Sequence, residues 1–306
     1  MPVAPKLFVL TGPTAVGKTE LALRWAEQYG GEIVSCDSLL FYRGMDIGTA
    51  KPTPAEQARV PHHLIDIHAV DEPMNIQAFV VQARAAVDDI LGRGRRVLVT
   101  GGSGFYLKAF FAPIADEVTI PQDLRVELEE RLAREGLESL VEELRAVNPD
   151  GLGGLDVANP RRVIRALERC RVTGRTVLEL REEMRARPSA FADLAVECVR
   201  LERPRPELWS RIDQRIAQML DAGLVAEVER LLEAGIQRNP SASRAIGYRE
   251  TILMLRGELS ADDLPSAIAR NTRALVRKQE TWFRTQLPPH RVLSADEARV
   301  EALFET

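Results

Sequence analysis

The chain has 306 residues, of which 45% are apolar and 28% are charged, and its formal net charge is −4. This length allows roughly two domains, and a chain of this size can bury a core without disulfides or metal ions. No apolar run approaches the roughly 18 residues of a membrane-spanning helix, and the N-terminus lacks the apolar segment of a secretory signal. Three widely spaced cysteines (Cys36, Cys170 and Cys198) form no CxxC pair, which excludes a zinc ribbon or a disulfide framework. We therefore expect a cytoplasmic protein with no membrane partner.

The charge is distributed unevenly along the chain. Residues 111–150 carry 11 acidic and 4 basic side chains, whereas residues 159–187 carry 9 basic and 4 acidic ones. Residues 265–291 carry 6 basic side chains and 1 acidic side chain. A weakly acidic total therefore conceals two basic segments, which are typical of surfaces that bind polyanions.

Strands alternate with helices in the first third of the chain. Short apolar runs predict strands at residues 6–11, 32–35, 64–67 and 97–100, and one-sided apolar periodicity predicts a helix over residues 75–91. From Pro113 to residue 187 helix formers dominate, and residues 196–201 again predict a strand. The pattern predicts an α/β fold, with a P-loop parallel-sheet core, helices on both of its faces and an all-helical insertion domain. The core is predicted to comprise residues 1–112 and 196–306, and the insertion domain to comprise residues 113–195.

A glycine-rich segment follows the first predicted strand and fits the pattern G-x-x-x-x-G-K-[ST] in full. It consists of Gly12, Pro13, Thr14, Ala15, Val16, Gly17, Lys18 and Thr19. Backbone N–H groups of such a loop, together with the helix that follows, bind phosphate groups. Lys18 is expected to contact the terminal phosphates, and Thr19 supplies a hydroxyl for Mg²⁺. The motif indicates a diphosphate or triphosphate ligand, and ATP is only one such ligand.

A carboxylate, Asp37, directly follows the second predicted strand. Ligands of open parallel sheets bind beyond the carboxyl ends of the strands, so Asp37 is expected to face the phosphate site. It is a candidate general base or indirect Mg²⁺ partner, and the alternative is a turn or N-cap carboxylate. The strand at residues 97–100 ends in Thr100 rather than in an acidic residue, which is a poor fit to an ATPase that activates water.

Eight segments occur in an order that resembles one enzyme family, the tRNA dimethylallyltransferases, also called tRNA isopentenyltransferases. They are GPTAVGKT (12–19), SCDSLLFYRGMDIGTAKPT (35–53), PHHLIDI (61–67), GGSGFYLKA (101–109), NPRRVIRALE (159–168), RIDQRIAQMLDAGLVAEVE (211–229), RAIGYRE (244–250) and RKQETWFR (277–284). The resemblance covers nearly the whole chain. It implies transfer of a dimethylallyl group from dimethylallyl diphosphate to N6 of the adenosine 3′ to the tRNA anticodon, with release of diphosphate.

The resemblance also implies roles for individual residues. Asp37 matches the general base, Lys18 and Thr19 match contacts to diphosphate and Mg²⁺, and Arg215 matches an arginine near the diphosphate. Ser103 replaces a threonine that contacts the target nucleotide, and Arg125 matches a further tRNA contact. The candidate tRNA-binding residues are Asp37, Ser38, Leu39, Leu40, Ser103, Arg125, Arg161, Arg162, Arg165, Arg244, Gly247, Tyr248, Arg249, Arg273 and Arg277. The zinc finger that eukaryotic relatives often add is not expected, because its cysteines are missing. We expect a monomer that contacts the anticodon stem-loop through its insertion domain.

A long helix is predicted from Ser260 to Gln286, beginning at a capping box of Ser260 with Asp263. Its apolar side is predicted to hold Leu264, Ile268, Leu275 and Trp282. Arg270, Arg273, Arg277 and Arg284 fall on the opposite side. This basic side is either solvated or, in a tRNA-binding protein, directed at phosphates.

Two other functions fit parts of the pattern. A P-loop kinase of a small acceptor would explain the phosphate loop and Asp37, but not the arginine-rich segments or the helical insertion. A nucleotide switch that binds RNA would need a strand that ends in a carboxylate, or a residue that positions water, and neither is visible.

Overall fold

The computed structural model describes residues 4–114 and 118–304. The chain divides into a core unit, residues 1–112 with 190–306, and an insertion unit, residues 113–189. The insertion therefore ends six residues earlier than predicted. The reason is that Phe191 packs against Phe110 of the core unit, with ring centroids 4.6 Å apart. In the part of the chain that the structure describes, no helix is long and apolar enough to cross a membrane.

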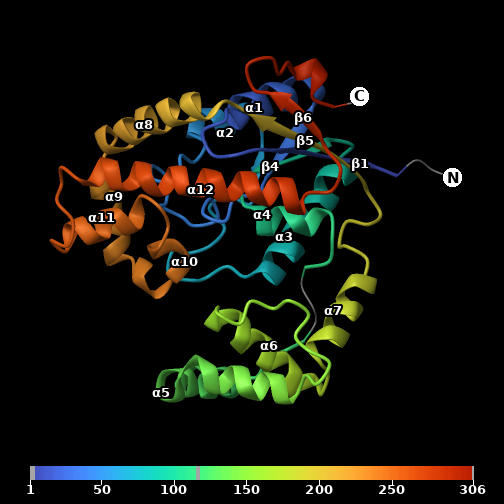
Figure 1. The fold of residues 1–306 in the computed structure, drawn as a ribbon. Coiled ribbons are helices and arrows are strands. Elements are labelled where there is room, and N and C mark those ends of the chain that lie inside the picture. Colours follow the sequence, from blue (N-terminus) through green and yellow to red (C-terminus); the bar gives the residue numbers. More distant parts are fainter. Residues whose placement is uncertain (1–3, 115–117, 305–306) are drawn as a thin grey trace. The chain divides into compact units, whose positions relative to one another are not determined.

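A six-stranded parallel sheet forms the centre of the core unit (Figure 1), in the order β3-β2-β4-β1-β5-β6. The strands are β1 (Lys6–Thr11), β2 (Gly31–Ser35), β3 (His62–His63), β4 (Arg96–Gly101), β5 (Ala195–Glu202) and β6 (Arg291–Ser294). Leu7 to Thr11 of β1 are all buried, as expected for a central parallel strand covered on both faces. The predicted α/β fold is confirmed.

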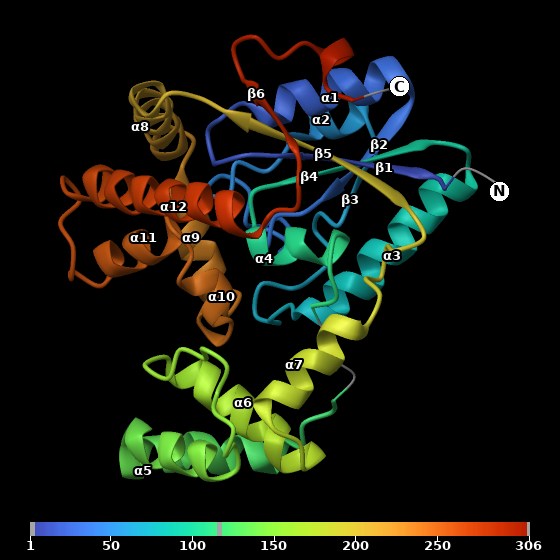
Figure 2. The same ribbon diagram turned by 45° about the vertical axis from the view of Figure 1, so that its right-hand side comes forward.

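Helices α1 (Lys18–Tyr29) and α3 (Ile76–Gly92) cover opposite faces of this sheet (Figure 2). On the α1 face, Phe8 of β1 packs against Trp25 and Phe304, with ring centroids 5.0 and 4.9 Å apart. On the α3 face, Phe79 contacts Phe41 and Tyr106. The sheet is thus packed between two aromatic clusters.

The prediction of a strand at residues 64–67 is wrong. β3 comprises His62–His63 only, and the chain leaves the sheet directly after it. Leu64 and Asp66 adopt φ angles of 61° and 56°, which lie in the left-handed region and are incompatible with a strand. An apolar run alone does not reveal such a turn.

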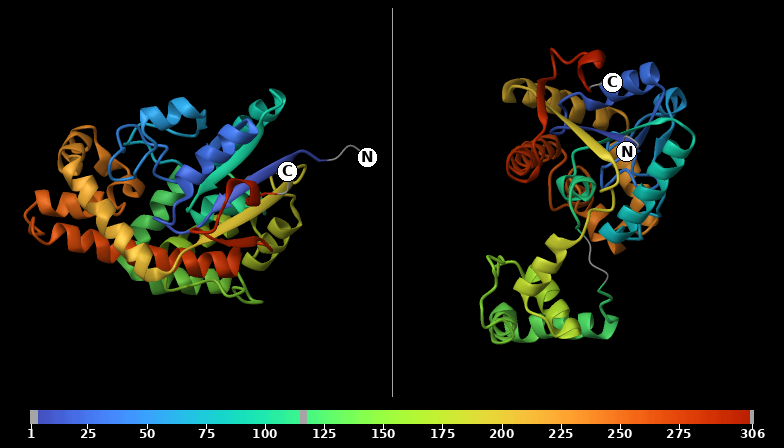
Figure 3. Two further views of the ribbon diagram at one scale, coloured as in Figure 1. Left: turned by 90° about the horizontal axis from the view of Figure 1, so that it is seen from above. Right: turned by 90° about the vertical axis from the view of Figure 1, so that its right-hand side faces the viewer.

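The second half of the core unit is helical, apart from β5 and β6. It contains α8 (Arg205–Asp221), α9 (Leu224–Glu233), α10 (Pro240–Ser243), α11 (Tyr248–Leu255) and α12 (Leu264–Gln286). Shorter helical segments elsewhere in this unit are α2 (Pro54–Arg59), α4 (Gly104–Leu107), η1 (Lys108–Phe110), η2 (Ile236–Arg238) and η3 (Val300–Ala302). Helices α8 and α12 pack side by side (Figure 3).

Helix α12 departs from the prediction in two respects. It begins at Leu264, because the Ser260–Asp263 pair closes the turn that precedes the helix. Its buried side chains are Leu264, Ala267, Ile268, Val276 and Phe283. Leu275 is 36% exposed, so the buried stripe is rotated by about one residue from the predicted one in the second half of the helix.

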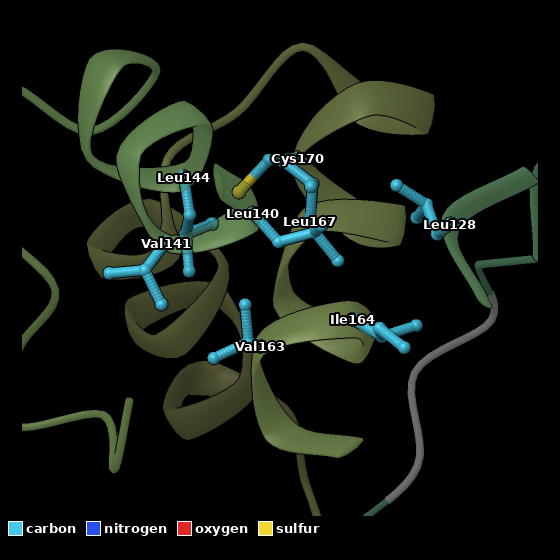
Figure 4. Packing of buried hydrophobic residues seen from close by; sticks show 8 residues of the cluster. All are labelled: Leu128, Leu140, Val141, Leu144, Val163, Ile164, Leu167 and Cys170. Carbon is cyan, nitrogen blue, oxygen red and sulfur yellow. The ribbon is translucent and has the colours of Figure 1, made fainter. Parts of the chain in front are cut away.

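The insertion unit consists of α5 (Gln122–Ala146), α6 (Pro160–Thr173) and α7 (Val177–Ala186). Gly136 kinks α5 with a φ of 83°. Caps fix the other two helices, since Asn159 and Thr176 accept hydrogen bonds from Arg162 N–H and Glu179 N–H. Figure 4 shows the separate core of this unit, formed by Leu128, Leu140, Val141, Leu144, Val163, Ile164, Leu167 and Cys170.

Gly101→Ala is expected to destabilise the protein by about 1–3 kcal/mol, because a Cβ at this position would overlap the Cys36 carbonyl of the neighbouring chain segment. Gly92→Ala is the matched control, since no atom lies within 4 Å of a Cβ built there. Alanine is also the better helix former at the end of α3. Urea unfolding measures both variants, and equal stabilities would contradict the packing argument.

Candidate active site

The phosphate loop connects β1 to α1, as the sequence predicts. Gly12 and Gly17 adopt φ angles of 148° and 111°, and Ala15 has a φ of 63°. Gly12 also lies against β5, because a Cβ on it would come within 2.6 Å of the Leu201 carbonyl oxygen. Glycine at these two positions therefore suits a backbone conformation that other residues rarely adopt, and at position 12 it also avoids a steric overlap.

The side chain of Lys18 folds back onto this loop. Its Nζ donates hydrogen bonds to the carbonyl oxygens of Gly12 and Pro13, at 2.8 and 2.9 Å. Burial lowers the pKa of Lys18 to about 8, and the positive charge of Arg215 adds to this effect while Asp37 opposes it. The ammonium group is thus held in place, ready to bind an anion.

Asp37 directly follows β2, and its Oδ1 accepts a hydrogen bond from Leu39 N–H at 3.1 Å. Burial raises the pKa of Asp37, whereas this hydrogen bond and the charges of Lys18 and Arg215 lower it. A carboxylate with a raised pKa is a better proton acceptor than an exposed one. The environment therefore suits a general base.

Arg215, on α8, points toward the phosphate loop. Its Nη1 donates to Thr14 Oγ1 at 3.4 Å, and burial lowers its pKa while the Asp37 charge raises it. Its position at the edge of the apolar stripe of α8 is what allows the side chain to turn inward.

Two cavities of about 470 and 530 Å³ meet at these residues. Both are lined by Thr14, Asp37, Thr49, Gly102 and Arg215. The first cavity also contains Lys18, Thr19 and Leu40. The second contains Ser38, Leu39, Ser103, Arg244 and Gly247. These predicted site residues thus divide between a cavity beside the phosphate loop and a more apolar cavity, and the two cavities share a wall.

Tyr248 does not reach either cavity. Its side chain is fully buried, and its hydroxyl donates to Glu227 Oε1 at 2.7 Å. The prediction that Tyr248 contacts tRNA is therefore wrong, because its ring packs against Gly48 inside the core unit. Arg249, its neighbour, is exposed and pairs with Glu250 at 2.5 Å.

Arg273 and Arg125 are engaged by carboxylates rather than free. Arg273 donates to both carboxylate oxygens of Asp213 at 2.7 Å and lies over the Trp209 ring. Arg125 pairs with the buried Glu168 at 2.8 Å. Arg273 is thus paired with a carboxylate on α8, and the tRNA contacts expected of Arg273 and Arg125 remain predictions. Arg277, one turn further along α12, is exposed.

A group of arginines marks one end of α6 in the insertion unit. Arg161 and Arg165 are exposed, and Arg162 lies 3.6 Å from Asp156. Burial lowers the pKa of Arg165, and the positive charges of Arg161, Arg169 and Arg125 lower it further. Mutual repulsion of this kind is relieved by a bound polyanion.

Two residues with contacts at the site are absent from the predicted set. Glu227 accepts hydrogen bonds from the N–H groups of Asp46, Ile47 and Gly48, and so holds the segment that leads to Thr49. Gln279 of α12 contacts Thr14 and Gly102. The signal that could reveal them is a polar residue on an otherwise apolar helix face, which indicates a specific partner.

Comparisons with known proteins agree on one family. The model of the family described as "IPP transferase" matches residues 40–286. A tRNA dimethylallyltransferase of Opitutus terrae is 59% identical over 95% of this chain and 94% of its own length. The crystal structure of a tRNA isopentenylpyrophosphate transferase from Bacillus halodurans has a TM-score of 0.69 and 33% identity, covering 97% of this chain and 93% of that chain. A structure of a eukaryotic dimethylallyltransferase acting on tRNA has a TM-score of 0.80 and 26% identity, and covers 95% of this chain and 74% of that one. The chain therefore belongs to the IPP transferase family.

Proposed function

We propose that this protein transfers a dimethylallyl group from dimethylallyl diphosphate to N6 of the adenosine 3′ to the anticodon in tRNA and releases diphosphate. The observation that carries the proposal is the wall between the two cavities. There Asp37 and Arg215 face both the phosphate loop and the second cavity. The relatives named above favour this reaction over phosphoryl transfer to a small acceptor.

Each cavity would bind one substrate. The loop N–H groups, Lys18 and Arg215 would bind the donor's diphosphate in the first cavity. The adenine would leave the anticodon loop and enter the second cavity between Asp37 and Ser103. Its N6 lone pair would attack C1 of the dimethylallyl group, the C1–O bond would break, and diphosphate would leave with the bonding electrons. Asp37 would accept the proton that N6 gives up.

The residues present fit a Mg²⁺ ion that is bound mainly by the donor. Among residues 4–114 and 118–304, no three or more His, Cys, Asp or Glu side chains are grouped so as to hold a metal ion. Mg²⁺ often takes only one or two protein oxygens, with water and substrate phosphates as its other ligands. The Thr19 hydroxyl, on the lining of the first cavity, is placed to be such a ligand. When bound, Mg²⁺ would neutralise charge on the leaving diphosphate.

The tRNA would be held by arginines of both units. Arg161, Arg162 and Arg165 of the insertion unit, and Arg244 at the second cavity, would contact phosphates and the anticodon loop. Because one chain lines both cavities, we propose a monomeric enzyme. We also propose that it acts in the cytoplasm, since the relatives named above modify tRNA. Incubation with radiolabelled dimethylallyl diphosphate, Mg²⁺ and unmodified tRNA tests the proposal. We expect the label to appear in the RNA, and its absence would contradict the proposed transfer.

Asp37→Asn is expected to slow single-turnover transfer by about 10²–10⁴-fold, because the amide cannot accept the N6 proton. Wild-type transfer should accelerate with rising pH as Asp37 gives up its proton, at a pH above that of an ordinary aspartate because burial raises its pKa. The variant should lack this step. Asp262→Asn, at an exposed position, is the control. A near-normal rate in Asp37→Asn would remove Asp37 from the mechanism.

Lys18→Ala is expected to weaken donor binding by about 10–100-fold, the effect of removing a charge-assisted hydrogen bond, while tRNA affinity is retained. Because the pKa of Lys18 is about 8, wild-type donor affinity should fall as the pH rises through this value and the ammonium is deprotonated. Calorimetry with dimethylallyl diphosphate between about pH 6.5 and 9.5, a range that brackets this pKa, measures both effects. Thr19→Ala should instead weaken the Mg²⁺ dependence. Equally weakened tRNA binding in both variants would contradict the assignment.

The double substitution Arg161→Ala with Arg165→Ala is expected to weaken tRNA binding and to flatten its dependence on salt. Removal of one phosphate interaction should reduce the slope of log K against log salt by roughly 0.7–0.9. Arg185→Ala removes an exposed arginine of the same unit and should change the slope far less. Filter-binding measurements of tRNA affinity between low and moderate salt test this prediction. An unchanged salt slope in the double variant would show that Arg161 and Arg165 are solvated and contact no phosphate.

A further inference from the structure

We propose that Gln279 is a positioning residue that fixes the phosphate loop relative to the segment bearing Ser103, and thereby sets the distance between the two reacting groups. The inference rests on the proposed function. Gln279 belongs to α12 and lines the second cavity, and its two hydrogen bonds are made to main-chain atoms. It contacts the backbones of two loops that belong to different strands.

Both the oxygen and the nitrogen of the Gln279 side-chain amide form hydrogen bonds. Its Oε1 accepts a hydrogen bond from Thr14 N–H at 3.0 Å, within the phosphate loop. Its Nε2 donates to the carbonyl oxygen of Gly102 at 2.9 Å, directly after β4. A Cβ on Gly102 would lie 2.7 Å from Nε2, so the close approach depends on glycine. Only a side chain with a donor and an acceptor side by side can join these two backbone groups.

The connection continues from Gly102 to the proposed base. Ser103, the next residue, accepts a hydrogen bond from Ser38 N–H at 3.2 Å through its hydroxyl oxygen. Ser38 follows Asp37, whose carboxylate is fixed by Leu39 N–H at 3.1 Å. Gln279 therefore completes a series of hydrogen bonds that runs from the loop expected to hold the donor's diphosphate to the loop that carries the base.

Packing already holds α12 in place without this amide. Val276 and Phe283 are fully buried on either side of Gln279 along the helix. Trp282 lies against Gly104, where it leaves no room for a Cβ. A methionine at position 279 would keep the length and most of the volume of the side chain while removing both hydrogen bonds. Removal of the amide should therefore affect the relative position of the two loops more than the fold.

Misplacement of reacting groups by about 1 Å can slow a reaction by about 10²-fold. We accordingly expect Gln279→Met to lower the single-turnover rate at saturating donor and tRNA by about 10–100-fold. The dissociation constants of dimethylallyl diphosphate and of tRNA should each stay within about threefold of wild type, because both hydrogen bonds of Gln279 are made to the protein's own backbone. This division between rate and binding is what a purely structural residue would not produce.

The experiment compares Gln279→Met and Gln279→Glu with wild type and with Gln286→Met. In Gln279→Glu the ionised carboxylate can still accept a hydrogen bond from Thr14 N–H, but it cannot donate to Gly102 and it repels that carbonyl oxygen. Gln286 lies exposed at the end of the same helix, so its replacement should leave rate and binding unchanged. Thermal unfolding is recorded for every variant, and rates are normalised to the folded fraction.

A fall in the normalised rate in both Gln279 variants, with substrate binding retained, supports the inference. A wild-type rate in either folded variant overturns it, as does a decrease that is accounted for by weaker binding of one substrate. If the wild-type protein itself transfers no label to tRNA, the proposed function fails and the inference falls with it. Activity of the wild type thus distinguishes the two failures.

Discussion

At the wall between the two cavities, Asp37 and Arg215 interact electrostatically with each other and with Lys18 of the first cavity, and burial acts against the charge on all three. It favours the neutral forms of Asp37 and Lys18, and it lowers the pKa of Arg215 as well. The attraction between Asp37 and the two cations opposes this effect. In the proposed reaction, an incoming diphosphate would add negative charge beside Lys18 and Arg215, so it would stabilise the cations and favour proton uptake by Asp37.

The rest of the core unit serves to hold these charges at fixed positions. The parallel sheet brings the ends of β1, β2 and β4 to one edge, and each end carries part of the site. The helices after β5 then close the site from the other side, with Arg215 on α8 and Gln279 on α12. Residues far apart in sequence thus meet at one wall because strand ends and helix faces are both rigid supports.

Local patterns predict most elements and the phosphate loop, whereas partners distant in sequence explain the errors. Residues 6–11 form β1 as predicted, because a buried apolar run next to a glycine turn depends on few other residues. The burial of Tyr248 and the pairing of Arg273 were not foreseen, because Glu227 and Asp213, which bind them, lie on other helices. The same holds for Arg125 and Glu168. No periodicity reveals which arginine an acidic side chain on another helix will neutralise.

The position of Gly12 against β5 determines when the surroundings of the phosphate loop are completed during synthesis of the chain. β1 and β4 are complete once residue 101 has been synthesised, but β5 follows only after the whole insertion unit. Gly12 packs on the Leu201 carbonyl, so the phosphate loop gains its neighbour on that side only when about 190 further residues have been synthesised. A nascent chain that ends before Leu201 therefore carries the loop without this contact. The proposed diphosphate site is therefore completed late in synthesis, when the insertion unit already has all of its residues.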